Sequence, residues 1–303
     1  MDFNGLSVDQ APPIWAPAIF FLTAPLFGVL AGILILFSDA QVLSNRYSLE
    51  AIAITHSLTI GFLSFVIFGA LTQMLPVLAG VRVAKVHFIS LISYLFLVLG
   101  TLCMVFGLLL DISVLIFAAS ALLGGGFLII ILSMLVALKS VINFTPSIKA
   151  MVTGLVFALF ISLVGMHLLA SHGVGKSSAS HLLLANVHSV WAVFGFAGIL
   201  IIGVSFHILP MFYVAPKFKS FFEKRVIWII SAGLFLWLCL NLFFESYALV
   251  AKLWIALFFL AYATAIHTKL NARRRKVSDI TIWYWRSASI FMLLGALAWV
   301  LND

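Results

Sequence analysis

Residues 61–76 read GFLSFVIFGALTQMLP, and residues 195–210 read GFAGILIIGVSFHILP. The two stretches align without gaps at an offset of 134 residues, and they share two glycines, a Gly-Phe start and a Leu-Pro end. Neither contains Lys, Arg, Asp or Glu, so each is apolar enough for the hydrocarbon core of a membrane. The repeated stretch therefore indicates a membrane protein built by duplication.

The composition of the whole chain supports this interpretation. Of its 303 residues, 64% are hydrophobic and 9% are charged, whereas soluble domains are roughly 45–50% apolar and about 25% charged. Such a chain cannot cover a water-facing surface, which excludes a soluble enzyme, a disordered protein and a secreted disulfide scaffold. The two cysteines, Cys103 and Cys239, both lie in apolar runs and are interpreted as packing residues.

Nine apolar runs are long enough to span a bilayer, which takes about 20 residues per helix. Because backbone groups in lipid must be hydrogen-bonded internally, and because no alternating strand pattern is present, all nine are predicted to be helices. The fold class is therefore all-α, a polytopic membrane helix bundle. The predicted helices cover residues 14–37, 49–75, 87–110, 112–138, 148–170, 181–209, 226–244, 247–268 and 280–301.

The net charge of +8 is interpreted as a topology signal and not as affinity for nucleic acid. With the N-terminus inside, fourteen Lys and Arg residues lie on the cytoplasmic side. Only three lie outside, namely Arg46, Lys176 and Lys252. The positive-inside rule then predicts a multi-pass protein of the cytoplasmic (inner) membrane, with a cytoplasmic N-terminus and a periplasmic C-terminus.

A second match extends the repeat. Residues 26–36, LFGVLAGILIL, align with residues 159–169, LFISLVGMHLL, at an offset of 133. Helices one to four are therefore predicted to be duplicated as helices five to eight, and four spans per copy make the copies parallel. We expect a single membrane domain over 1–303. Repeat one covers about 14–138, repeat two about 148–268, and an extra helix about 280–301.

Ionisable side chains inside a bilayer are candidates for functional sites. The predicted topology places His56, His167 and His188 at one depth near the outer face, with His172 further out. Imidazole is an axial ligand of haem iron and a common ligand of copper. His56, His188 and His167 are therefore candidate cofactor ligands, and all four histidines are candidate metal ligands. The alternative is that each imidazole only hydrogen-bonds to a neighbouring helix.

Two further observations qualify this prediction. When the glycines of the two copies are aligned, His56 falls opposite Val190, two residues from His188, so the copies do not place their histidines symmetrically. On the inner side, Gln73 aligns with His207. These two side chains form a candidate inner polar site for a quinone or a proton path, unless His207 lies at headgroup level.

The stretch THSLTIGFLSFVIFGALTQMLPVLAG at 55–80 resembles the haem-copper oxidase subunit I superfamily. The likeness is closest to its small non-oxidase relatives and to the nitric-oxide-response membrane protein NnrS. The shared pattern is a histidine early in the second helix, then Gly-Phe, a second glycine and Leu-Pro, and residues 187–210 repeat it. In that superfamily the second-helix histidine is an axial haem ligand, and the resemblance implies this role for His56.

The chain also departs from the family. It has no adjacent His-His pair, no His-x-x-x-Tyr element and no His-x-His pair, so the sequence does not support an oxygen-reducing centre. The resemblance implies a protein that binds haem b. Copper is a further candidate metal. Its expected roles are electron transfer, NO binding or response, and haem or copper handling. The expected partners are membrane lipids and a quinone or a respiratory-chain protein.

Two other functions remain open at this point. Duplicated bundles with polar residues at mid-depth also describe secondary transporters of a small solute or metal. A non-catalytic assembly subunit of a respiratory complex would use its histidines only for packing. The oligomeric state is not predicted.

Overall fold

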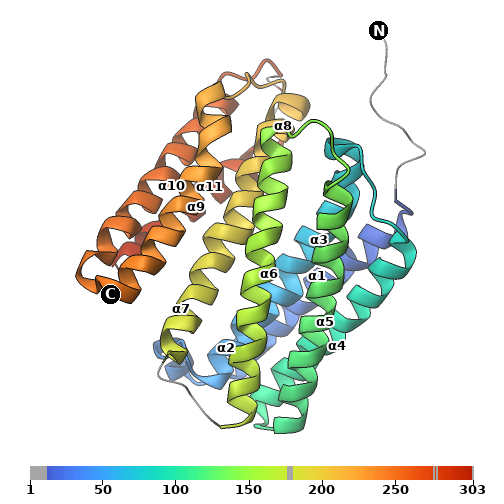
Figure 1. Cartoon of the computed structure of the whole chain (residues 1–303), viewed down its shortest axis with the longest axis vertical. Coiled ribbons are helices and arrows are strands. Elements are labelled where there is room, and N and C mark those ends of the chain that lie inside the picture. The colour runs from blue at the N-terminus through green and yellow to red at the C-terminus, as the bar shows by residue number, and fades with distance from the viewer. Residues whose placement is uncertain (1–11, 176–179, 276, 278, 302–303) are drawn as a thin grey trace. The chain divides into compact units, whose positions relative to one another are not determined.

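The computed structural model describes residues 12–175, 180–275, 277 and 279–301. Within these residues every regular element is a helix, and nine helical segments are long and apolar enough to cross a membrane. The chain is therefore a polytopic helical membrane protein, as predicted (Figure 1). The segments are α1 (Trp15–Phe37), α2 to η4 (Leu49–Ala79), α4 (Val86–Leu109), α5 (Ser113–Leu138), α6 (Pro146–Gly173), α7 to α8 (His181–Tyr213), α9 (Ser220–Phe243), η6 with α10 (Glu245–Asn271) and α11 (Ile280–Leu301).

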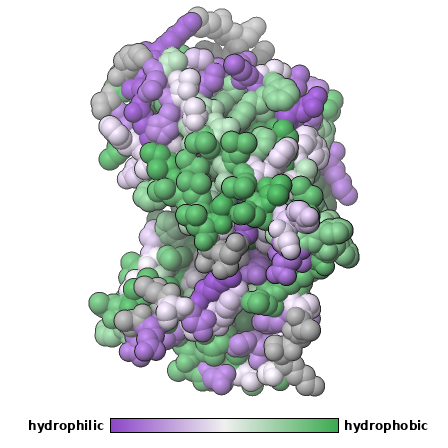
Figure 2. Space-filling view, turned by 90° about the vertical axis from the view of Figure 1, so that its left-hand side faces the viewer, coloured by the Kyte–Doolittle hydropathy of each residue, from purple (hydrophilic) through white to green (hydrophobic). Residues whose placement is uncertain are grey.

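The two shortest predicted loops are confirmed. Asp111 adopts a positive φ of 51° between α4 and α5, and the backbone N–H of Ile112 donates to the Gly107 carbonyl at 2.9 Å. A 3₁₀ turn, η6 (Glu245–Tyr247), separates α9 from α10 (Ala248–Asn271). On the face drawn in Figure 2, hydrophobic side chains form a continuous patch with hydrophilic side chains gathered above it, as expected for a surface that meets both lipid and water.

The chain divides into two compact units. Unit 1 consists of Met1–Ile142 and Leu159–His188, and unit 2 consists of Asn143–Ala158 and Ser189–Asp303. The division falls within α6 and at the end of α7, so it does not follow the boundaries of the predicted repeats. Unit 1 therefore contains a segment from each copy of the repeat.

In unit 1, α4 and α5 lie side by side (Figure 1). A Cβ atom on Gly100 would lie 2.9 Å from the backbone nitrogen of Leu123, so the two backbones approach as closely as small residues allow. In unit 2, α9, α10 and α11 lie side by side (Figure 1). Aromatic side chains fill its core, and the ring of Trp191 lies 5.2 Å from Phe157 and 5.0 Å from Phe235.

The repeat has a structural signature that the sequence did not predict. The helix of each copy widens into a π-helical segment, which is η3 (Ser57–Ser64) in the first copy and η5 (Trp191–Gly198) in the second. Both segments have eight residues, and they stand at the same offset of 134 as the aligned sequences. π-Helical turns are rare and are frequent at functional sites, so the duplicated backbone retains an unusual feature in both copies.

The two conserved glycines of each copy lie against the first helix of that copy. The pairs are Gly61 with Phe27, Gly69 with Phe20, Gly195 with Phe157, and Gly203 with Ala150. These contacts relate α1 to α6 at an offset of 130 residues. The offset of 133 predicted from residues 26–36 and 159–169 is therefore wrong by three residues. Three residues are close to one helical turn, so two apolar helices match almost equally well at either offset.

Candidate metal centre

His56 is held by its own helix. The hydroxyl of Ser48 accepts a hydrogen bond from the Ala51 backbone N–H at 3.1 Å and so caps α2 (Leu49–His56). His56 is the last residue of this helix and directly precedes η3. Its Nδ1 lies 2.8 Å from the Ile52 carbonyl oxygen. Because only a protonated Nδ1 can donate to a carbonyl, this contact leaves Nε2 free to act as a ligand.

His188 is held by a neighbouring helix. It lies on α7 (His181–Val190), and its Nδ1 lies 2.9 Å from the carbonyl oxygen of Ile161 on α6. Gly165 provides the space for the ring, since a Cβ at that position would lie 2.8 Å from His188 Cε1. The same tautomer follows as for His56, with Nε2 available. Both histidines therefore carry the backbone hydrogen bond that typically orients a metal-bound imidazole.

The two imidazoles form a stacked pair within unit 1. Their ring centroids are 6.0 Å apart, and the ring planes differ by 25°. With metal–nitrogen bonds of about 2.0 Å, and each ring centroid about 1 Å beyond its nitrogen, one ion between two imidazoles separates the centroids by roughly 6 Å. The observed separation matches this value, but the rings are stacked, so a shared metal would require the imidazoles to turn until both Nε2 atoms point at the same ion.

A narrow cavity adjoins the two rings. It contains about 360 Å³ of empty space, some of it open to the outside, but a water-sized sphere can be centred in only about 50 Å³ of it. Since one water molecule needs roughly 10–15 Å³ of such space, the cavity has room for a few water molecules. Besides the two histidines, its walls are formed by Ile60, Met104, Ser120, Leu123, Gly124, Phe127, Ser162, Gly165, Met166 and Leu169.

The polar groups of these walls are largely engaged with the backbone. Ser120 Oγ donates to the Met166 carbonyl at 3.1 Å, and Ser162 Oγ donates to the Leu159 carbonyl at 2.8 Å. The remaining wall is aliphatic, aromatic or sulfur-containing. The imidazole nitrogens and the sulfurs of Met104 and Met166 are therefore the main electron-pair donors left to the cavity.

Polar side chains link the two helices that carry His56 and His188. The link lies at the ends that the predicted topology places near the outer face. Tyr47 Oη donates to Asn186 Oδ1 at 3.0 Å, and Arg46 Nη2 donates to the same oxygen at 3.4 Å. Asn186 is two residues before His188, and Tyr47 precedes the cap of α2. These bonds constrain the separation of the helices that carry the two ligands.

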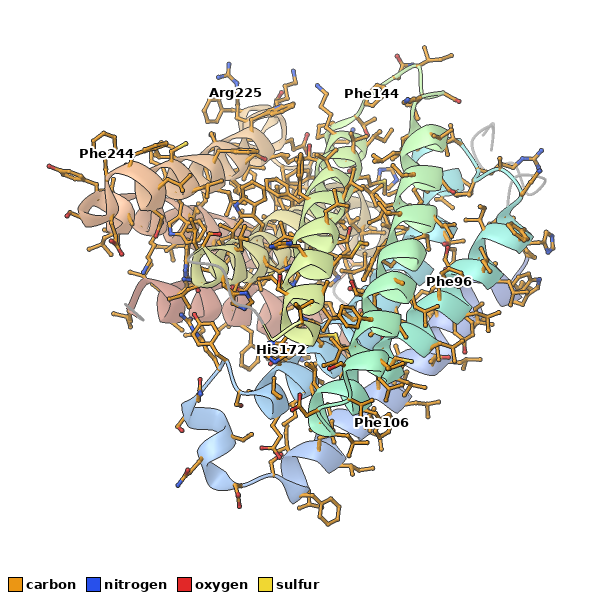
Figure 3. The ribbon with its side chains drawn as sticks, turned by 60° about the horizontal axis from the view of Figure 1, so that its bottom comes forward. Phe96, Phe106, Phe144, His172, Arg225 and Phe244 are labelled. Carbon is orange, nitrogen blue, oxygen red and sulfur yellow. The ribbon has the colours of Figure 1, made fainter. Side chains whose placement is uncertain are left out.

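The other predicted ligands are not part of this cluster. His167 and His172 are exposed on α6 and do not line the cavity; Figure 3 shows His172 at the end of that helix. Over the part of the chain that the structure describes, no group of three or more His, Cys, Asp or Glu side chains could hold a metal ion. The structure thus brings together His56 and His188, the first two candidates.

The inner polar site remains a prediction. Gln73 belongs to unit 1 and His207 to unit 2, and both side chains are exposed. The sequence did not indicate Met104, Met166 or Gly165 as parts of the outer site. No signal distinguished these residues from ordinary packing residues of an apolar helix.

Comparisons with protein-family models, with curated proteins and with solved structures give no match to this chain. The chemistry of the site is therefore inferred from its geometry.

Proposed function

We propose that this protein binds haem b in the membrane, with His56 and His188 as the two axial ligands, and that it transfers electrons. The observation that carries the proposal is the stacked pair of imidazoles, 6.0 Å apart, each with Nδ1 at a backbone carbonyl. Turned toward one ion, two such imidazoles suit the two axial positions of a haem iron.

A haem would need more room than the present cavity offers. A porphyrin is thicker than a water molecule, and a water-sized sphere can be centred in only about 50 Å³ of this space, so the walls would have to move apart on binding. The apolar walls would pack against the macrocycle, whereas the space beside Gly124 is filled by Met166 and the space beside Gly165 by the His188 ring. When bound, haem supplies an iron that changes oxidation state by one electron. The carbonyl groups of Ile52 and Ile161 orient the imidazoles.

Two protein ligands favour electron transfer over gas binding. If His56 and His188 both held the iron, the chemistry that the haem would supply here is the transfer of single electrons. This arrangement is in keeping with the proposed kinship to small non-oxidase relatives of the haem-copper oxidase superfamily and NnrS. The proposed electron partner is a quinone or a respiratory-chain protein. We also propose the cytoplasmic membrane as its location, with the N-terminus inside.

A bare copper ion is the second candidate for the same site. Met104 and Met166 line the cavity together with the two histidines, and thioether and imidazole donors suit Cu(I). In that case the protein would handle or store copper and would have no haem spectrum.

The test is a reduced-minus-oxidised optical spectrum of the purified full chain, expressed with ample haem, together with metal analysis. We expect a Soret band, α and β bands typical of a six-coordinate b-type haem, and about one iron per chain. Copper without a Soret band would replace the first candidate by the second. Protein that is folded but lacks both iron and copper would overturn the metal-centre proposal and favour a transporter or an assembly subunit.

A further inference from the structure

A second cavity of unit 1 lies at the opposite end of the second membrane span from His56. The connection from η4 (Leu75–Ala79) to α4 is short and turns sharply. Gly80 and Lys85 both adopt positive φ, at 66° and 49°. Together with Pro12 and Pro13, which precede α1, this connection surrounds the cavity. A water-sized sphere can be centred in about 480 Å³ of it, so the cavity is wide where the histidine site is narrow.

The walls of this basic pocket carry positive charge. Arg82, Lys85 and His87 line it with exposed side chains, and the lining residues from Pro12 onward include no carboxylate. Neither Arg82 nor Lys85 forms an ion pair with any Asp or Glu among the residues for which the structure gives a position. Two cations that line a cavity of this size, with no acid beside them among the described residues, favour an anionic ligand.

The backbone adds to this preference. Val86 and His87, which line the pocket, form the first turn of α4, and no side chain caps that helix. The first N–H groups of a helix lack partners within it and attract anions. These N–H groups and the three basic side chains act on the same space.

The surroundings of the pocket are those of a membrane interface. The pocket lies where the third span begins, and the ring of Trp15 at the start of α1 lies 5.5 Å from the ring of His87. Tryptophan is enriched at the level of lipid headgroups. Apolar side chains next to the pocket are exposed, including Phe88 at 64% and Val77 at 44%. A ligand with an anionic head and apolar chains would satisfy both surfaces.

We propose that this pocket binds the phosphate of an anionic phospholipid such as phosphatidylglycerol, with Arg82 and Lys85 contacting the phosphate oxygens. The acyl chains lie along the exposed apolar residues beside the pocket. Basic pockets at the cytoplasmic ends of membrane helices are suited to this role, and the proposed topology puts this loop on that side. The inference does not depend on the metal centre.

The test is native mass spectrometry of the full chain, reconstituted with equal amounts of phosphatidylglycerol and phosphatidylcholine. Wild-type protein should retain phosphatidylglycerol preferentially. The double variant Arg82→Gln/Lys85→Gln should weaken that retention roughly tenfold or more, because each basic residue near an anionic surface contributes substantially to binding. Arg82→Lys/Lys85→Arg should keep most of it. Arg274→Gln/Arg275→Gln is the matched control, since both of these side chains are exposed in another loop, and it should behave as wild type.

Competition with inorganic phosphate separates the two sources of a phosphate group. If excess phosphate leaves the retained lipid in place, the acyl chains contribute to binding as proposed. Displacement of the lipid by phosphate alone would overturn the lipid assignment. Equal retention of both lipids by wild type, or unchanged retention in the glutamine double variant, would overturn the site itself.

Discussion

The π-helical segments η3 and η5 have the same length and the same place in the repeat, but their surroundings differ. In the first copy, η3 follows directly after His56, whose ring adjoins a narrow cavity. In the second copy, η5 begins at Trp191, whose ring is 6% exposed and packs between Phe157 and Phe235. One copy thus keeps space beside its π segment, whereas the other fills that space with aromatic rings.

The two copies thus share one π-helical segment and its glycines, but they do not share their chemistry. The backbone likeness is also incomplete, because the π-helical η4 (Leu75–Ala79) has its counterpart at 209–213 within α8 (Ile199–Tyr213). The glycines that allow close approach to the first helix are present in both copies. The histidines are not equivalent, because His188 lies three residues before η5 whereas His56 adjoins η3. The two imidazoles meet as a stacked pair in unit 1 and do not form two symmetric sites. We therefore expect one cofactor per chain, and four predictions test this view.

The largest expected effect is the loss of the cofactor. His56→Ala and His188→Ala should each remove the haem spectrum or convert it to a five-coordinate form. We expect affinity to fall by more than the roughly 10- to 100-fold that loss of a supporting group costs a metal site. Optical titration with haem measures this change.

His167→Ala is the matched control for these variants. His167 is exposed on α6, the helix that supports His188, and its removal should leave the spectrum unchanged. Loss of haem from His167→Ala but not from His188→Ala would mean that the second ligand has been misassigned.

The next largest effect is expected in a test of the topology, because the fused enzyme is either active or inactive. Alkaline phosphatase fused after Asn45 or after Gly175 should be active in the periplasm, since each site follows the first span of one copy. A fusion after Asp303 should also be active, whereas one within residues 270–278 should be inactive. If the fusions after Asn45 and Gly175 differed, the two copies would be antiparallel, and the comparison between them would fail.

The sequence predicted the coarse architecture because it depends on length and composition alone. Nine apolar runs and their charged or polar breaks identified the spans, including the short loop at Asp111. The pairing of His56 with His188 followed from counting residues to the same depth. Both inferences use only the rise per residue of a helix and the thickness of the bilayer.

The side of the helix was harder to predict than the depth. Gly165 packs against His188, and His167 is two residues further on. At about 100° per residue, these two positions lie on nearly opposite faces of α6, so His167 points away from the site. The apolar sequence of α6 contains no periodic signal that indicates which face is buried.

Other features of the site leave no trace in the side-chain sequence. The carbonyl oxygens that orient the two histidines belong to Ile52 and Ile161, and any residue provides such an oxygen. The π-helical turns result from a shift of backbone hydrogen bonds from i→i+4 to i→i+5. Neither could be read from residue types.

A smaller effect is expected on stability, because the glycines of the two copies pack against their first helices at different distances. Gly203→Ala should lower stability by about 1–3 kcal/mol, because its new Cβ would overlap the Cβ of Ala150. Gly69→Ala should cost less, since its Cβ would lie 3.2 Å from both Phe20 Cβ and the Pro17 carbonyl oxygen. Thermal unfolding of the purified variants measures the difference.

The double variant Ala150→Gly/Gly203→Ala controls for this mechanism. It exchanges the two side chains across the same contact, so it should recover most of the stability that Gly203→Ala loses. If the double variant were as unstable as Gly203→Ala alone, overlap with Ala150 would not be the cause.

The smallest expected effect is at Trp191, where the second copy begins its π segment. The side chain belongs to unit 2 and does not line the cavity of the histidine pair. Trp191→Phe should therefore leave the haem spectrum and the midpoint potential unchanged, while the smaller ring loosens its packing against Phe157 and Phe235. We expect a modest loss of stability, about 1 kcal/mol. Potentiometric titration and thermal unfolding of the same preparation separate these two readouts. A shifted potential at unchanged stability would show that the aromatic cluster acts on the cofactor, and the second copy would then have a functional role beside its structural one.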